Sequence, residues 1–69
     1  MAEIALTVNG EPRHIAGPAT LADLLAQLRL DPRLVVVELN QEIVRRPRLG
    51  EVALKDGDVV ELVHFVAGG

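Results

Sequence analysis

Apolar and polar residues alternate at the start of the chain and predict its first strand. In residues 3–8, every second side chain is large and apolar: Ile4, Leu6 and Val8. This is the period of a half-buried strand. Asn9-Gly10 follows, and because both residue types tolerate positive φ, the pair predicts a type I′ turn into an antiparallel strand over residues 11–16. Pro12 cannot donate a ladder hydrogen bond, so its amide position should face outward or lie beside the turn.

The spacing of four leucines predicts one helix. They recur at i, i+3, i+4 and i+7 and so form a single apolar stripe: Leu21, Leu24, Leu25 and Leu28. Thr20 is a candidate N-cap, and Asp23 completes an acidic variant of the capping box. Because Pro32 disfavours helical geometry at Asp31, the helix is expected to end near Leu30. A helix of about ten residues with one apolar face needs a sheet to cover.

A β-branched, almost continuously apolar run predicts the third strand, over residues 34–40. Such a run is typical of a strand in the middle of a sheet. The rest of the chain divides into a turn with a short strand, a connection with a short helical or extended piece, a second turn and a last strand: residues 41–44, 45–54, 55–58 and 59–66. Three apolar residues are expected to anchor the connection: Leu49, Val52 and Leu54. A right-handed crossover through the helix places the first and last strands side by side.

These elements predict an α+β fold in which a mixed sheet of four to five strands is covered by one main helix. The chain length of 69 residues fits one domain, residues 1–69. We expect its end, from about residue 66 to residue 69, to form a flexible tail.

Composition narrows the class of protein. The chain has no cysteine, so disulfides and thiolate zinc sites are excluded, and its net charge of −3 argues against a nucleic-acid binder. The longest aliphatic run, residues 34–37, is far too short to span a bilayer, and no signal peptide is visible. We therefore expect a cytoplasmic domain whose partners include neither nucleic acid nor a membrane.

Few residues could catalyse a reaction or bind a metal. His14 and His64 stand far apart without a ligand motif, so no metal site is expected. Asp56 and Asp58 flank Gly57 and indicate a turn rather than calcium ligands. Three arginines surround Pro47, and such a cluster is either a solvated loop or a contact for acidic groups of a partner: Arg45, Arg46 and Arg48. The chain is not expected to be an enzyme.

The order of elements and the terminal Gly-Gly resemble the ubiquitin-like β-grasp fold. More closely, "VVVELNQEIVRR" and "LKDGDVVELVHFVAGG", together with "VNGEPR" and "TLADLLAQL", resemble the ThiS family, the sulfur carrier proteins of thiamine biosynthesis. Members often have a third glycine where this chain has Ala67, and an aromatic residue in the region of Leu49. The resemblance covers nearly the whole chain.

A reaction at the carboxylate of Gly69 would explain why the sequence ends in Gly68-Gly69. A carboxylate is a poor electrophile and must be activated, most simply by adenylation, but the chain has no phosphate-binding G-x-x-x-x-G-K-[ST] loop. The resemblance implies that an adenylyltransferase related to ubiquitin-activating enzymes supplies this step, using ATP and magnesium, while this chain binds no cofactor. A sulfur-donating enzyme would then make the thiocarboxylate, and thiazole synthase would receive the sulfur.

Threading this carboxylate into each partner requires a slim tail, which Val66, Ala67 and Gly68 are expected to form because glycine permits close backbone approach. Docking affinity must then come from the folded surface. If Val60 and Leu62 face the core, then Val63 and Phe65 share the opposite face with Glu61, and these two apolar side chains are the predicted partner-binding residues.

Two other functions remain open at this point. The small subunit of molybdopterin synthase has the same fold, terminal Gly-Gly and thiocarboxylate, although it commonly has a proline near its tail, which "HFVAGG" lacks. A ubiquitin-like tag or docking module would instead form isopeptide bonds or only bind.

Overall fold

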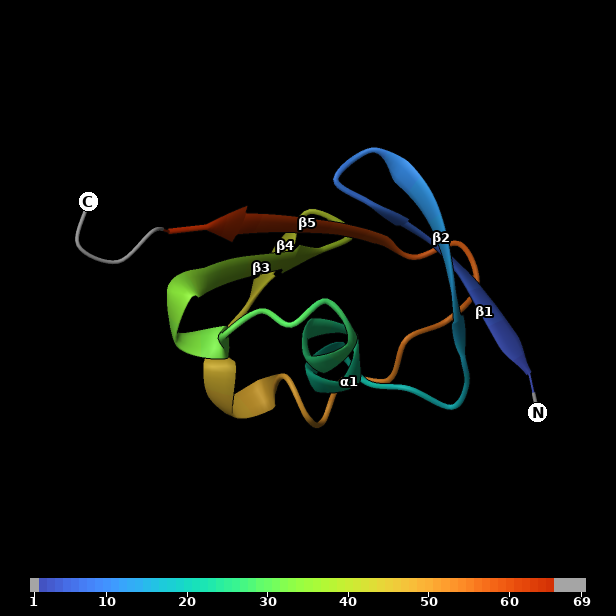
Figure 1. The fold of residues 1–69 in the computed structure, drawn as a ribbon, viewed down its shortest axis with the longest axis horizontal. Coiled ribbons are helices and arrows are strands. Elements are labelled where there is room, and N and C mark those ends of the chain that lie inside the picture. Colours follow the sequence, from blue (N-terminus) through green and yellow to red (C-terminus); the bar gives the residue numbers. More distant parts are fainter. Residues whose placement is uncertain (1, 66–69) are drawn as a thin grey trace.

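Five strands and one α-helix make up the described part of the protein. The computed structural model describes residues 2–65. The elements follow one another as two strands, a helix, a 3₁₀ turn, two strands, a second 3₁₀ turn and a last strand: β1 (Glu3–Val8), β2 (Glu11–Ala16), α1 (Leu21–Gln27), η1 (Pro32–Leu34), β3 (Val35–Leu39), β4 (Glu42–Val44), η2 (Arg46–Arg48) and β5 (Val59–His64). Helix α1 lies across one face of the sheet (Figure 1).

The sheet is mixed and has the order β2-β1-β5-β3-β4. Strand β1 runs parallel to β5 and antiparallel to β2, and β3 runs antiparallel to both β5 and β4. The first and last strands are therefore neighbours, as the crossover rule predicts. This arrangement confirms the expected β-grasp architecture.

Two tight hairpins have the same backbone geometry. In the β1–β2 turn, Asn9 and Gly10 both have positive φ, and in the β3–β4 turn Asn40 and Gln41 do too. Two consecutive positive φ angles are the signature of the type I′ turn. The first turn was predicted from its Asn-Gly pair, whereas Gln41 gives no such signal because glutamine rarely adopts this conformation.

The position of Pro12 shows which backbone groups of a hairpin make no hydrogen bond to the partner strand. Val8 opposes Glu11 next to the turn, and Thr7 opposes Pro12 one step further. Antiparallel ladders alternate between hydrogen-bonded and non-hydrogen-bonded pairs, and the pair that closes a two-residue turn is hydrogen-bonded. Pro12 thus stands where its nitrogen points away from β1, on an edge strand. This agrees with the prediction for its amide position.

Helix α1 begins as predicted and ends earlier than predicted. The Thr20 side chain accepts from the Asp23 N–H at 3.2 Å, and the Asp23 carboxylate accepts from the Thr20 N–H at 2.8 Å, which completes the capping box. The helix was expected to reach the vicinity of Leu30, but Arg29 adopts a φ of 59°. The N–H of Leu30 then reaches back to the Leu25 carbonyl at 3.0 Å, so a left-handed residue, rather than Pro32, ends the helix.

The prediction that residues 34–40 form the central strand was wrong. The middle strand is β5, and β3 lies between β5 and the short strand β4. Val35 and Val37 are buried, but Val36 is on the far side of the sheet and is exposed. Because the single helix covers only one face, the other face stays open to solvent, and an apolar run in β3 does not mean burial on both sides.

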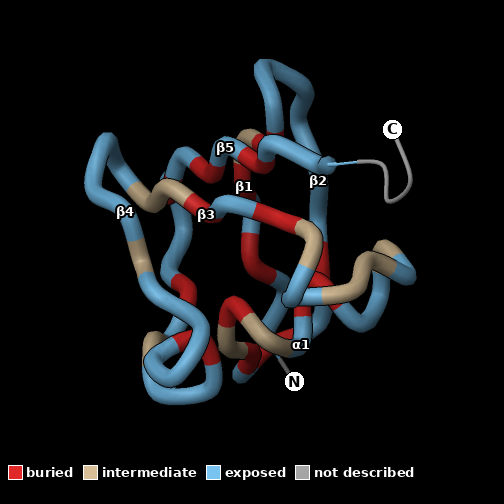
Figure 2. Tube along the Cα trace, turned by 90° about the vertical axis from the view of Figure 1, so that its left-hand side faces the viewer, coloured by how far each residue is buried: buried red, intermediate tan, exposed pale blue. Residues whose placement is uncertain are grey.

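The core lies between α1 and the sheet. Its most deeply buried side chains come from the helix and from two of the interior strands, β3 and β5: Leu21, Leu24, Leu25, Val37 and Val60. Figure 2 shows the buried segments of α1 and of the sheet turned toward each other. Leu49 and Leu54 are also buried, and Val52 packs against the core, which confirms the predicted anchors of the connection after β4.

Gly17 permits a close contact at the start of the crossover. A Cβ placed on Gly17 would lie 2.8 Å from the end of the Ile4 side chain. Such a distance forces a shift of the neighbouring side chain, so glycine lets the segment before α1 pack directly against the Ile4 side chain of β1.

An ion pair at η1 gives a testable pH dependence. Arg33 donates side-chain hydrogen bonds to both carboxylate oxygens of Asp31, the shortest at 2.7 Å, and these lower the pKa of Asp31 from 3.8 to about 2. A lowered pKa in the folded state means that this contribution to stability is complete above the unfolded value and is lost as the pH falls through about 2. In Arg33→Gln, we expect the pKa of Asp31, followed by NMR titration of its side-chain carbonyl, to return toward 3.8. An unchanged titration would show that Arg33 is not the cause.

Candidate functional site: the outer sheet face beside the C-terminal tail

The predicted reactive end of the chain lies beyond the described residues. Gly69, Gly68, Ala67 and Val66 are outside residues 2–65. The last described residue, Phe65, donates its N–H to the Leu34 carbonyl at 2.7 Å. The structure therefore shows how β5 is fixed up to the point where the tail begins.

Strand β5 is held by hydrogen bonds on both sides. On one side it pairs with β3 from Val60 to His64. On the other, β1 pairs only as far as Val60, and the Asn9 side chain then takes over: its oxygen accepts from the Leu62 N–H at 2.7 Å and its amide donates to the Leu62 carbonyl at 3.2 Å. A side-chain amide thus extends the ladder by one position, which holds the strand that leads to the tail.

The turn before β5 is also fixed. Asp58 is buried, and its carboxylate accepts from the Lys55 N–H at 2.8 Å and from the Asn40 side-chain amide at 3.1 Å. Asp56 accepts from the Ala5 N–H at 2.8 Å. These contacts agree with the expected role of both aspartates in turn formation. They also position the start of β5 between β1 and the β3–β4 hairpin.

The facing of β5 agrees with the prediction. Val60 and Leu62 are buried in the core, whereas Val63 and Phe65 are 53% and 54% exposed on the opposite face. These two residues are thus correctly placed to contact a partner beside the tail. Their role in binding remains a prediction.

Three more large apolar residues lie on the same outer face, and the sequence analysis missed them. Val36 lies directly opposite Val63 in the β3–β5 ladder, Val59 lies two steps before Glu61 on β5, and Ile43 on β4 lies opposite Glu38. With Val63 and Phe65, they are the large exposed hydrophobic residues of the described chain. Opposed residues in a ladder point to the same face, so this outer face forms one apolar surface.

Two carboxylates interrupt this apolar surface. Glu38 lies directly opposite Glu61 in the β3–β5 ladder. Like charges in this position are destabilising. The outer face therefore combines apolar side chains with a local negative charge, an arrangement more typical of a contact surface than of a sheet optimised for stability alone.

The other candidate residues do not form a site. His14 lies on the edge strand β2 and His64 at the end of β5, and no group of three His, Cys, Asp or Glu side chains among residues 2–65 could hold a metal ion. Within the same residues, no helix is long and apolar enough to cross a membrane. The arginine cluster surrounds η2, at the sheet edge formed by β4.

Replacing Phe65 tests the outer face. If these residues bind a partner, we expect Phe65→Asp to weaken binding to the adenylyltransferase that the sequence resemblance implies by about tenfold or more, because a buried charge would replace a central apolar contact. Its free energy of unfolding should change by less than about 0.5 kcal/mol, since the side chain is exposed. Ala26→Asp, on the exposed side of α1, is the matched control and should leave binding unchanged. Titration calorimetry and urea denaturation measure the two effects. A large loss of stability in Phe65→Asp would contradict the assigned face.

Comparison with known proteins places the chain among sulfur carriers. The profile of the ThiS family matches residues 6–69. The chain is 52% identical over 50 residues to the sulfur carrier protein ThiS of Bacillus subtilis, an alignment that covers 72% of this chain and 76% of that protein. The crystal structure of the thiamine biosynthesis protein ThiS from Geobacter metallireducens superposes with a TM-score of 0.81 at 38% identity, and the match covers 96% of this chain and 100% of the other.

A longer relative contains a similar segment. The thiazole synthase of Paramagnetospirillum magneticum is 44% identical to this chain over 64 residues, which cover 93% of this chain. The chain spans only 20% of the length of that relative. A segment like this one is thus joined covalently to a protein named for thiazole synthesis.

Proposed function

Because this chain belongs to the ThiS family, we propose that it carries sulfur as a thiocarboxylate on Gly69 and donates it for the thiazole ring of thiamine. Family membership supports the expected class, a sulfur carrier protein. The family match supports the proposal most strongly, because it extends through residue 69 and so includes the terminal Gly-Gly.

Two chemical steps load the carrier. A carboxylate oxygen of Gly69 attacks the α-phosphorus of ATP on the adenylyltransferase, and pyrophosphate leaves with magnesium bound to it. The acyl-adenylate then reacts with a sulfur nucleophile: hydrosulfide adds to the carbonyl carbon, AMP leaves, and one proton is released. The product is a thiocarboxylate at the end of the chain, whose sulfur is a good nucleophile. The partner enzymes catalyse both steps, and this chain supplies the reacting group.

The folded domain contributes binding and position. Strand β5 leads into the tail, and the outer face offers the apolar side chains of Val63 and Phe65 within three residues of residue 66. Because ordering the tail costs on the order of 1–2 kcal/mol per residue, the affinity for each partner must come from this face. The exposed apolar side chains of Val63 and Phe65 therefore support a carrier whose folded surface binds the partner and whose C-terminal residue reacts.

Thiazole synthase is the proposed sulfur acceptor. The relative in which a similar segment is part of a thiazole synthase supports this assignment, since covalent joining is an effective way to keep two interacting domains at high local concentration. The same proposal includes the adenylyltransferase, a separate sulfur-donating enzyme and a cytoplasmic location.

Intact-protein mass spectrometry tests the loading step. We expect the native protein, incubated with the adenylyltransferase, ATP, magnesium and a sulfide source, to gain the mass difference between sulfur and oxygen. Fragmentation should map the gain to Gly69 and show that this residue ends the mature chain. Omission of ATP is the control and should leave the mass unchanged. A chain that stays unmodified with all components present would refute the proposal.

A further inference from the structure

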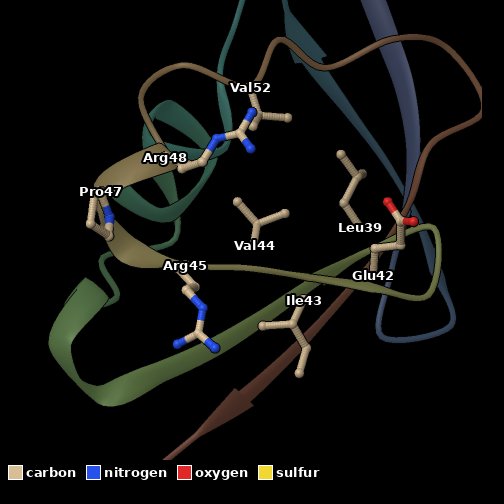
Figure 3. A pocket seen from close by; sticks show the side chains of 8 residues that line it. All are labelled: Leu39, Glu42, Ile43, Val44, Arg45, Pro47, Arg48 and Val52. Carbon is tan, nitrogen blue, oxygen red and sulfur yellow. The ribbon is translucent and has the colours of Figure 1, made fainter.

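A hollow runs along the free edge of β4, the outermost strand of the sheet. Its volume is about 440 Å³. Leu39, Val44 and Val52 point into it from one side of the strand, while Ile43 and Arg45 point to the other side (Figure 3). Because side chains from both faces of β4 line this hollow, the hollow runs along the unpaired backbone edge of the strand.

The backbone of Ile43 is directed to this edge. Leu39 opposes Glu42 next to the two-residue turn, and Glu38 opposes Ile43 one step further. By the alternation described above for Pro12, Ile43 is in a non-hydrogen-bonded pair, so its N–H and C=O point away from β3. An edge strand that presents such groups can accept another extended segment.

The opposite wall of the hollow is preformed. Within η2, the Arg48 N–H donates to the Arg45 carbonyl at 2.9 Å. The segment that follows is fixed to the start of α1: the Ala22 N–H donates to the Leu49 carbonyl at 3.0 Å, and the Leu21 N–H donates to the Val52 carbonyl at 3.1 Å. These hydrogen bonds hold the wall against α1. Binding of a ligand would therefore not have to pay for ordering the backbone of this wall.

The edge carries more basic than acidic side chains, with Glu42 as the one acidic residue that lines the hollow, although the chain as a whole is acidic. Three of its seven Lys and Arg residues surround Pro47: Arg45, Arg46 and Arg48. Among residues 2–65, the one ion pair of this cluster joins Arg48 to Glu51 at 3.7 Å, with both side chains exposed. A pair of this kind contributes little, so the guanidinium groups beside the hollow are available to carboxylates of a ligand.

We propose that the free edge of β4 binds an extended segment of a partner protein in which apolar residues alternate with acidic ones. The segment pairs with the N–H and C=O of Ile43 as an additional strand. Its apolar side chains fill the hollow over Leu39, Val44 and Val52, and its carboxylates, which point to the other side of the added strand, meet Arg45. Backbone pairing supplies affinity, and Arg45 supplies specificity for acidic residues.

This edge is distinct from the reactive tail but continuous with the outer sheet face through Ile43. A partner could therefore hold the domain by its edge while it works on the tail. The inference concerns the edge alone and does not depend on sulfur transfer. Its test uses an unloaded protein, so failure of the edge proposal and failure of the proposed function give different results.

Peptide titration of the isotopically labelled full chain tests the proposal. The probe is a blocked pentapeptide that alternates valine with glutamate, and its counterpart has glutamine in place of glutamate. We expect saturable shifts of the backbone amide signals of Ile43, Val44 and Arg45, and slower hydrogen exchange at Ile43. The glutamine peptide should bind roughly threefold to thirtyfold more weakly, and added salt should reduce the difference. Shifts confined to β2 or to the outer face, equal binding of both peptides, or no binding would overturn the proposal.

Variants separate the charge from the backbone contribution. Arg45→Gln should lose the preference for the glutamate peptide, whereas Arg13→Gln, on the opposite edge strand β2, should keep it. Ile43→Pro removes the proposed donor at the position that corresponds to Pro12 in the other hairpin, and should weaken both peptides. If the amide spectrum shows that Ile43→Pro is unfolded, Arg45→Gln decides: an undiminished preference in this variant refutes the role of charge.

Discussion

Deletion of Gly69 should reduce sulfur loading by at least about a hundredfold and leave the fold intact. The deleted chain still ends in a carboxylate, but that group lies about 3.5 Å short of its place in the active site of the adenylyltransferase. Misplacement of a reacting group by about 1 Å can already cost a factor of about one hundred. The deletion changes none of the residues of the core between α1 and the sheet, so we expect the free energy of unfolding to be unchanged.

The matched control for this deletion is Ala67→Gly. It keeps the length of the tail and makes it resemble the three-glycine tail that ThiS proteins often have, so its loading rate should stay close to that of the natural chain. Single-turnover loading, followed by intact mass, measures both variants. If the deleted chain loads as fast as the natural one, then Gly69 is not the reacting residue and the carrier mechanism fails.

Leu24→Ala should have the largest effect on stability. Leu24 is 0% exposed and lies in the core between α1 and the sheet. Truncation of a buried leucine costs about 2–5 kcal/mol, because the transfer free energy is lost and a cavity remains. A domain of this size has a total stability of about 3–10 kcal/mol, so Leu24→Ala should remove a large fraction of the free energy of unfolding.

Ile43→Ala is the control for this prediction. Ile43 is 65% exposed, and its truncation should change the free energy of unfolding by less than about 0.5 kcal/mol. Urea denaturation of both variants gives the comparison. Equal costs for the two substitutions would contradict the assignment of the core to the helix-covered face.

Local signals explain which parts of the fold could be predicted from sequence. The strand at residues 3–8 alternates strictly, the Asn9-Gly10 pair specifies its turn, and Thr20 with Asp23 specifies the helix start. Each of these features depends on residues that are close together in the chain. The end of α1 could not be read in the same way, because Arg29 has no intrinsic preference for the left-handed conformation that it adopts.

The partner-binding face could be predicted only in part, because it depends on strand register. Val63 and Phe65 follow from the alternation within β5. Val36, however, is hidden in an apolar run, and only its pairing with Val63 and the absence of a helix on that side place it on the outer face. Ile43 required the same information from the β3–β4 hairpin. The chemistry at Gly69 was a prediction from sequence and remains one.

The central claim is that sulfur bound to Gly69 becomes the sulfur of a thiazole. The most direct measurement loads the carrier with an isotopically labelled sulfur, removes free sulfide, and adds thiazole synthase with its other substrates. Our account predicts that the label appears in the thiazole product as the carrier returns to its unlabelled carboxylate mass. A carrier that is fully loaded but transfers no label to thiazole, under conditions in which the synthase accepts a known sulfur carrier, would contradict it.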